Sequence, residues 1–437
     1  MKLFYLFVVL LLISIMPATA QTTPAEAFEN VTVYRSDGTA LSGATIVWRG
    51  NKIEAVGRDI TIPFDARVRD GGDSLHVYSG FIDGLALWGS PERSTGQARP
   101  AHTGEPTYER AGIQPNRSPH LELADKDMEF KEARLEGFLT AAIGLEGHML
   151  PGQIDIFNIR DIATPDHVLR KKIAQLSQFQ TARGVYPSTL MGVMAHFRQL
   201  WLDAEALQEH QNLYASNTTA YSFPGHDSIL EALFPVIDNS IPIYFVADSK
   251  EDIERVLKLK YELGFDMVLV SGKEAYTMAG ELESRNIPVL ASIDMPDKPS
   301  WMKKDGDKDT KGDKEAKKIS AEEELFRERR QEAYENRATN ILSLMQAGVK
   351  VGYASNDMAV SEFRENLRTV MEYGLSDTQV MVMLTTETAN ILGIEADHGK
   401  LEAGQMANFS VYSTPLEAED WKLEFSVSAG ELYRINN

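Results

Sequence analysis

Short apolar runs alternate with amphipathic segments between residues 240 and 293, and this alternation is the clearest structural signal in the chain. Three of the runs have the composition of buried strands: residues 241–247, 267–270 and 287–291. The segments between them have helical periodicity, and Gly264 is expected to end the first helix. A second helix is expected over roughly residues 273–285. Strands that alternate with helices at this spacing predict parallel pairing with right-handed crossovers.

Similar strand segments lie on either side of this region, at residues 137–143, 154–159 and 348–354. Repeated strand-helix units over a stretch of this length predict the α/β class, with a closed (β/α)8 TIM-type barrel. A doubly wound open sheet is the alternative. Residues 28–78 instead alternate apolar and polar positions around the turn Gly50-Asn51, which predicts β structure before the barrel.

The first twenty residues have the pattern of a targeting segment. Lys2 is followed by an apolar run from Leu3 to Met16, and small residues lead up to Ala20. This pattern is typical of a secretory signal peptide cleaved after Ala20, and the run is too short for a comfortable membrane span. We therefore expect export to a periplasm or to the cell exterior, with an uncleaved anchor as the alternative. The absence of cysteine excludes disulfides and cysteine-linked lipids.

Composition limits the partners. Hydrophobic residues make up 43% of the chain, and the formal net charge is −20. This charge argues against nucleic acid or an anionic membrane as a partner. No second apolar span follows the first, so no membrane span is expected after cleavage. Residues 90–122 are expected to form a long loop, and the mixed-charge residues 299–319 are expected to be disordered.

Motifs at both ends of the predicted barrel carry a family resemblance. Residues 79–87 (SGFIDGLAL) resemble the strand Pro-Gly-Phe-Ile-Asp-x-His-x-His that opens the barrel of the amidohydrolase superfamily. Residues 386–393 and 399–411 resemble that family's C-terminal helix and the segment after it. The order and spacing of these motifs are closest to the imidazolonepropionase-like branch. The resemblance implies a barrel over residues 79–395 and a small β-sandwich built from residues 28–78 and 396–437.

The resemblance also implies metal-ligand positions, and this chain fills most of them with residues that cannot bind a metal. The two histidines of the first strand correspond to Leu85 and Leu87. Alternate residues of a strand share a face, so such a pair would point at one ion. The histidines of the fifth and sixth strands correspond to Val246 and Ser271. The ligand on the fourth strand is not placed.

The aspartate of the eighth strand corresponds to Asn356 by direct counting, or to Asp357 after a slip of one residue. A catalytic metal needs about three protein ligands, and it lowers the pKa of bound water from about 15.7 to near 7. Our first hypothesis is therefore an exported pseudoenzyme with no resident cofactor, which has lost metal-dependent hydrolysis. It would bind a small molecule in the barrel mouth, or scaffold an active paralogue or a second copy of itself.

Two further hypotheses stay open, so the sequence leaves undecided whether the protein is an enzyme. Asp83, Asp248 and Asp357 fall near strand ends and could form a reduced carboxylate site for one divalent metal such as Zn, Mg or Mn. Such a site would hydrolyse carbon–nitrogen bonds other than peptide bonds, with His148 as a further candidate. Structural roles compete with this interpretation, including pairing of Asp357 with Arg364 or Arg368. The third hypothesis is an interaction protein that contacts its partner through the two long loops.

Overall fold

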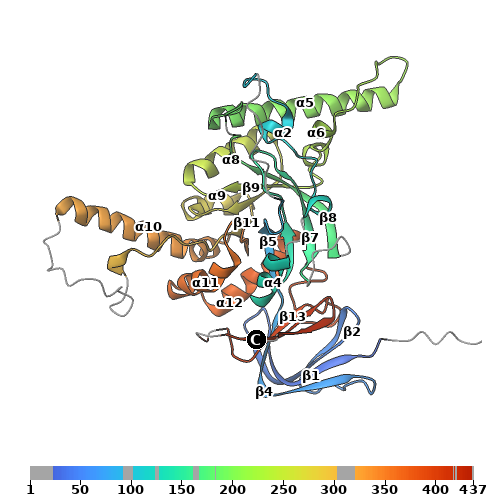
Figure 1. Ribbon diagram of the computed structural model, residues 1–437, viewed down its shortest axis with the longest axis vertical. Coiled ribbons are helices and arrows are strands. Elements are labelled where there is room, and N and C mark those ends of the chain that lie inside the picture. Colours follow the sequence, from blue (N-terminus) through green and yellow to red (C-terminus); the bar gives the residue numbers. More distant parts are fainter. Residues whose placement is uncertain are drawn as a thin grey trace, which may run out of the picture.

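The computed structural model describes residues 23–91, 102–123, 127–160, 167–182, 184–302, 320–416, 418 and 421–435. The predicted signal peptide and residues 303–319 of the predicted disordered segment lie outside these ranges. Figure 1 shows a seven-stranded sheet at one end of the molecule and helices α5 and α6 at the other. None of the described helices is long and apolar enough to cross a membrane.

An eight-stranded sheet forms the centre of the larger part (Figure 1). Its strands follow one another in chain order: β5 (Phe81–Ala86), β6 (Phe138–Ile143), β7 (Gly152–Asn158), β8 (Val168–Gln178), β9 (Ile243–Ala247), β10 (Met267–Ser271), β11 (Val289–Ala291) and β12 (Val351–Tyr353). The edge strands meet through one parallel bridge between Ala86 and Asn356. The predicted α/β class is confirmed, with a sheet like that of a TIM barrel.

The uniform (β/α)8 pattern that we expected is wrong for strands β6 to β8. Strand β7 runs antiparallel to both of its neighbours, so the three strands form a meander. Only residues 144–151 separate β6 from β7, which is too short for the crossover helix that a parallel connection requires. Strand β8 was not predicted, because Arg170, Lys171 and Lys172 interrupt its apolar pattern.

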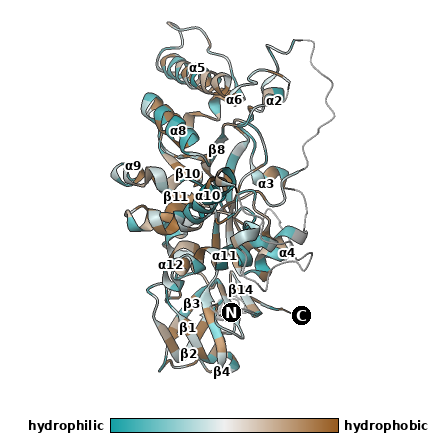
Figure 2. Cartoon of the chain, turned by 90° about the vertical axis from the view of Figure 1, so that its left-hand side faces the viewer, coloured by the Kyte–Doolittle hydropathy of each residue, from teal (hydrophilic) through white to brown (hydrophobic). Residues whose placement is uncertain are grey.

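The parallel half of the sheet, β9 to β12, follows the predicted alternation. Helix α8 (Lys250–Leu263) begins after Ser249, whose hydroxyl accepts a hydrogen bond from the backbone amide of Asp252. The helix ends at Gly264, which has φ +79°. The helix expected over residues 273–285 is a 3₁₀ turn, η2 (Ala275–Met278), followed by α9 (Ala279–Ser284). Figure 2 shows hydrophilic residues on α8 and hydrophobic ones on β10 and β11, as burial of the strands requires.

The remaining helices surround these strands (Figure 1). They are α2 (Tyr108–Ala111), α3 (Pro119–Glu122), α4 (Asp127–Leu135), α5 (Leu190–Ser216), α6 (Ser228–Glu231), α7 (Phe234–Ile237), η3 (Ser300–Met302), α10 (Ala321–Gln346), η4 (Val360–Glu362), α11 (Phe363–Glu372), α12 (Asp377–Val382), η5 (Met383–Glu387) and α13 (Thr388–Leu392). Helices α2 and α3 lie in the segment predicted to be one long loop, 90–122. That prediction is therefore wrong for part of the segment.

Both chain ends contribute to the seven-stranded sheet. Its order is β15 (Glu431–Arg434), β14 (Leu423–Ser428), β13 (Phe409–Tyr412), β4 (Arg67–Ser79), β1 (Glu26–Tyr34), β2 (Ala40–Arg49) and β3 (Lys52–Gly57). Where the resemblance implied a sandwich, these strands form a single hydrogen-bonded sheet. Trp48 on β2 lies 5.2 Å from Phe409 on β13 between ring centroids. In a flat sheet three strand spacings would separate them by about 14 Å, so the sheet curls around its apolar core.

The carboxyl group of Asp83 helps to join the two edges of the eight-stranded sheet. Asp83 lies fully buried on β5. Its Oδ1 accepts hydrogen bonds from the backbone amides of Leu85 and of Ser355, which follows β12, each at 3.1 Å. The Asn356 amide donates to the Leu85 carbonyl at 2.8 Å beside it. Burial raises the pKa of Asp83 to about 7, and the hydrogen bonds from Ser355 and Leu85 oppose this shift.

Truncation of Trp48 is predicted to destabilise the curled sheet. Trp48 is 1% exposed and packs on Phe28 as well as Phe409. Trp48→Ala is expected to lower the free energy of unfolding by about 3–5 kcal/mol, measured by urea denaturation. The control Phe64→Ala removes a fully exposed ring and is expected to cost less than about 0.5 kcal/mol. Equal effects of the two variants would contradict the packing described.

The buried Asp83 is predicted to make stability depend on pH. Its folded pKa of about 7 lies above the ordinary value of 3.8, so between these values the unfolded state releases a proton that the folded state keeps. The free energy of unfolding therefore falls as pH rises through this window, by at most about 1.4 kcal/mol per pH unit, and the decline ends above the folded pKa. Asp83→Asn keeps an Oδ1 acceptor and is expected to flatten the decline in urea titrations. The exposed control Glu402→Gln should leave the decline unchanged.

Candidate ligand site at the mouth of the eight-stranded sheet

A pocket of about 560 Å³, here called the mouth pocket, lies where strands β5, β6, β8, β9 and β12 end. Its volume is in the range of small-molecule sites in proteins. The lining combines apolar, amide and carboxylate side chains with one glycine: Leu87, Leu145, Glu146, Gly147, Leu176, Gln178, Gln180, Val246, Asn356 and Asp357. Strand ends at this face of a barrel are the usual location of ligand and active sites.

Three of the predicted metal-ligand positions form an apolar wall beside the pocket. Leu87 and Val246 line it and pack against the apolar cluster inside the sheet. Leu85 belongs to the same cluster and is 0% exposed. Hydrocarbon side chains offer no lone pair, and transfer of a bare ion to such surroundings costs solvation energy that nothing returns. These positions therefore do not fit the metal that the resemblance implies.

The other predicted positions occupy strained backbone at strand ends. Ser271 ends β10 with φ +70°, and Asn356 follows β12 with φ +52°. Such conformations cost non-glycine residues on the order of 1–3 kcal/mol, and they persist where the surroundings hold them in place. The Asn356 backbone is held by Leu85, whereas the Ser271 hydroxyl is buried and has no hydrogen-bond partner in the described ranges.

Both alignments of the eighth strand lead to the mouth pocket, because Asn356 and Asp357 each line it. The side-chain Nδ2 of Asn356 donates a hydrogen bond to the Asp357 carboxylate at 3.0 Å. Asp357 does not pair with an arginine among the described residues, and Arg364 instead pairs with Glu136. The structural interpretation of Asp357 as an arginine partner is therefore wrong.

The rim includes residues that the sequence analysis missed. Gln178 ends β8, and its amide nitrogen donates to the Gly147 carbonyl at 2.7 Å and to Gln180 Oε1 at 3.1 Å. Since β8 occupies the fourth position of the sheet, Gln178 marks the end of the strand whose ligand could not be placed. The alternation of buried apolar Ala174 and Leu176 with polar neighbours was the available signal.

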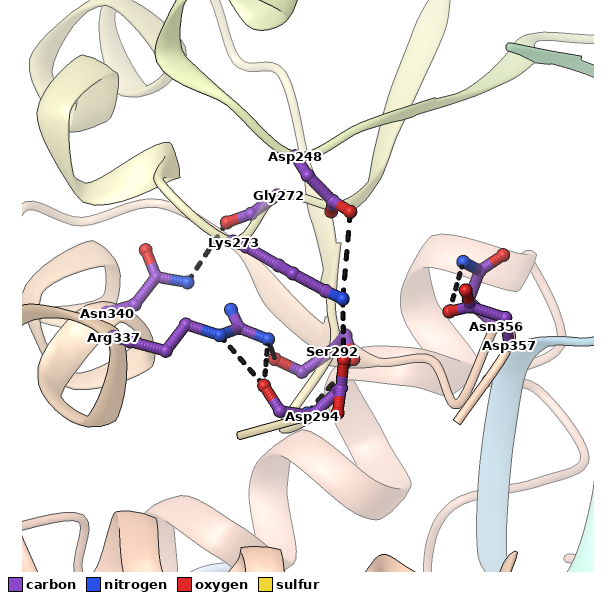
Figure 3. A network of polar contacts seen from close by, with 9 residues as sticks. All are labelled: Asp248, Gly272, Lys273, Ser292, Asp294, Arg337, Asn340, Asn356 and Asp357. Carbon is purple, nitrogen blue, oxygen red and sulfur yellow. Dashed lines mark hydrogen bonds and ion pairs between the residues drawn. The ribbon is translucent and has the colours of Figure 1, made fainter. Parts of the chain in front are cut away.

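The three candidate carboxylates do not come together. Asp83 uses its carboxyl group in backbone hydrogen bonds. Asp248 lies 3.7 Å from Lys273 Nζ, which is 2.5 Å from Asp294, and Figure 3 shows this network apart from Asn356 and Asp357. His148 is not among the residues that line the mouth pocket. Within the part of the chain that the structure describes, no group of three or more His, Cys, Asp or Glu side chains could hold a metal ion.

Arg337 fixes the backbone around this network. Its Nε donates to the Asp294 carbonyl at 2.8 Å, and its Nη2 donates to the Ser292 carbonyl at 3.2 Å (Figure 3). Burial lowers the pKa of Arg337 to about 10, which still leaves the guanidinium charged at neutral pH. The ends of β9, β10 and β11 are therefore tied together by protein cations, Lys273 and Arg337, rather than by a shared set of metal ligands.

No protein-family model and no curated protein sequence matches the chain. Among solved structures, an amidohydrolase from Thermotoga maritima MSB8 matches with a TM-score of 0.74 at 20% identity, over 94% of this chain and 100% of that one. A prolidase solved with N-methylphosphonate-L-proline has a TM-score of 0.52 at 14% identity, over 94% and 100%. Phenylurea hydrolase B has 0.53 at 13%, over 94% and 96%. These similarities show that the chain shares the fold of these solved structures, which include an amidohydrolase.

Proposed function

We propose that this protein binds a small organic ligand in the mouth pocket and does not carry out metal-dependent hydrolysis. The observation that carries the proposal is the apolar wall of Leu85, Leu87 and Val246 at the positions where the resemblance implies metal ligands. A metal-activated water would need donors there, and these side chains supply none. The similar solved structures include hydrolases by their names, but at these identities they support the fold and not the reaction.

The lining of the mouth pocket favours a neutral or positively charged ligand. Glu146 and Asp357 are exposed carboxylates at its edge, and no Lys, Arg or His is among its lining residues. The leucines and Val246 offer contact to an apolar portion, while Gln178, Gln180 and Asn356 offer amide groups. A small amine or amide with an apolar body matches this combination, because each part of it meets a complementary surface.

The reduced carboxylate site has less support than ligand binding. Asp83 and Asp248 already have partners on the protein, which leaves Asp357 as the one member of the three that lines the mouth pocket. A scaffolding role toward an active paralogue or a second copy is compatible with ligand binding and forms part of the proposal. The signal-peptide pattern supports export as the setting, and we propose it on that ground alone.

Metal analysis tests the loss of hydrolytic chemistry. The purified full-length protein, after dialysis, is expected to hold well below one equivalent of zinc, manganese or other divalent metal by elemental mass spectrometry, because the donor set is missing. Added zinc is expected to leave the melting temperature unchanged. Asp357→Asn serves as the matched variant and should give the same metal content. One tightly held ion per chain, lost in Asp357→Asn, would instead establish the carboxylate site.

Occupation of the mouth pocket by a larger side chain tests ligand binding. A panel of small amines and amides screened by ligand-observed NMR is expected to include compounds that bind the wild type. Val246→Trp places an indole in the mouth pocket and is expected to lower the affinity for these compounds by about tenfold or more. The control Met191→Trp changes an 82% exposed residue on α5 and should leave binding intact. Unchanged affinity in Val246→Trp, or a panel without binders, would count against the proposal.

A further inference from the structure

A second cavity, of about 400 Å³, lies against the outer face of β7 and β8 and shares no lining residue with the mouth pocket. We call it the outer cavity. On β7, Ile154 and Ile156 belong to the apolar cluster inside the sheet, so the alternate residue Gln153 faces outward. The β6–β8 meander has no crossover helix to cover this face. Residues of α6 and α7 line the cavity instead, including Glu231 and Pro235.

Two neighbouring glutamines leave buried acceptors at this face. Gln153, which lines the cavity, is 4% exposed, and its Oε1 has no hydrogen-bond donor among the described residues. Its register partner on β8 is Gln175, which is 0% exposed. The side-chain Nε2 of Gln175 donates a hydrogen bond to the Gly152 carbonyl at 2.7 Å. Its Oε1 also has no hydrogen-bond donor among the described residues. Buried acceptors are normally paired, so these two oxygens mark an unmet need for hydrogen-bond donors at the wall of the cavity.

Lys172 supplies a positive charge to the same cavity. Its backbone adopts φ +56°, and its amide donates to Asp155 Oδ1 at 2.7 Å, which holds this unusual conformation in place. The ammonium group makes no ion pair with any residue that the structure describes, although Lys172 lines the cavity. A ligand carboxylate could therefore approach it without displacing a protein partner.

Glu231 supplies the opposite charge from α6. Gln211 donates to its Oε1 at 2.8 Å, and His226 Nδ1 lies 2.7 Å from the same oxygen. The pKa of Glu231 is lowered, chiefly by the hydrogen bond from Gln211, so the side chain is ionised at neutral pH. Both contacts fall on Oε1, which leaves Oε2 for another donor. Lys172 and Glu231 form no ion pair with each other, so the cavity presents two separated charges of opposite sign.

We propose that the outer cavity binds a small zwitterion with the chemistry of a free amino acid. Its carboxylate would meet the Lys172 ammonium, and its ammonium would meet Glu231 Oε2. Ala232, Pro235 and Ile241 line the same cavity and offer an apolar surface to a short side chain. The two separated charges of the cavity are both met by one ligand of this kind. The proposal does not depend on the function of the mouth pocket.

Calorimetric titration of the full-length protein with glycine, L-alanine, L-leucine and L-proline tests this site. At least one is expected to bind saturably. For leucine, 4-methylpentanoic acid lacks the amino group and 3-methylbutylamine lacks the carboxylate. If leucine binds, each analogue is expected to bind with an affinity about tenfold lower or more, because one charged contact is lost. The absence of binding by all four amino acids at millimolar concentration would overturn the proposal, as would analogues that bind as well as leucine.

Charge-removing variants locate the binding. Lys172→Gln and Glu231→Gln are each expected to lower the affinity for the tightest-binding amino acid by about tenfold. The circular dichroism spectrum of each variant should stay unchanged. The control Lys171→Gln removes the neighbouring exposed charge, which does not line the outer cavity, and should bind as the wild type does. Wild-type affinity in both Lys172→Gln and Glu231→Gln would show that the amino acid binds elsewhere and would overturn the assignment.

Discussion

The contact between the first and last strands of the eight-stranded sheet determines the geometry of the mouth. Strand β12 is only three residues long, and its link to β5 consists of one backbone bridge and the hydrogen bonds around Asp83. Leu87 comes from one side of this contact, and Asn356 and Asp357 come from the other. A carboxyl group in this position must be buried, since it bonds to backbone amides of both segments. The raised pKa of Asp83 is a consequence of that position.

The apolar residues at the mouth contribute to packing of the sheet interior. A buried leucine contributes on the order of 1.5–3 kcal/mol through removal of its surface from water. Leu85 and its neighbours therefore extend the interior cluster toward the surface, where a metal site would instead require buried polar ligands and their desolvation. Figure 3 shows the protein's own charged groups, Lys273 and Arg337, tying together the adjoining strand ends. Hydrogen bonds and ion pairs within the protein thus join the strand ends beside the mouth pocket.

Local signals predicted the fold best where caps and periodicity agreed. Helix α8 begins after Ser249 and ends at Gly264 as expected, and the predicted apolar runs form strands β9 to β11. The meander of β6 to β8 could not be predicted in this way, because periodicity does not reveal strand direction and three basic residues obscure β8. At the site, the motif pointed to Leu85, Leu87 and Val246, and two of these, Leu87 and Val246, line the mouth pocket. It could not show that Asp83 turns to backbone amides or that Asp248 pairs with Lys273, since both depend on tertiary contacts.

The pairing of β4 with β13 joins Val77 to Val411, across most of the length of the chain. During synthesis this edge of β4 stays unpaired until β13 has been made, long after β4 itself. An unpaired edge of this kind is a template for wrong strand pairing between molecules. Loss of the last strands by premature termination or proteolysis would therefore do more than shorten the protein. It would expose the β4 edge at residues 76–79, which pair with β13, and favour aggregation of the truncated chains.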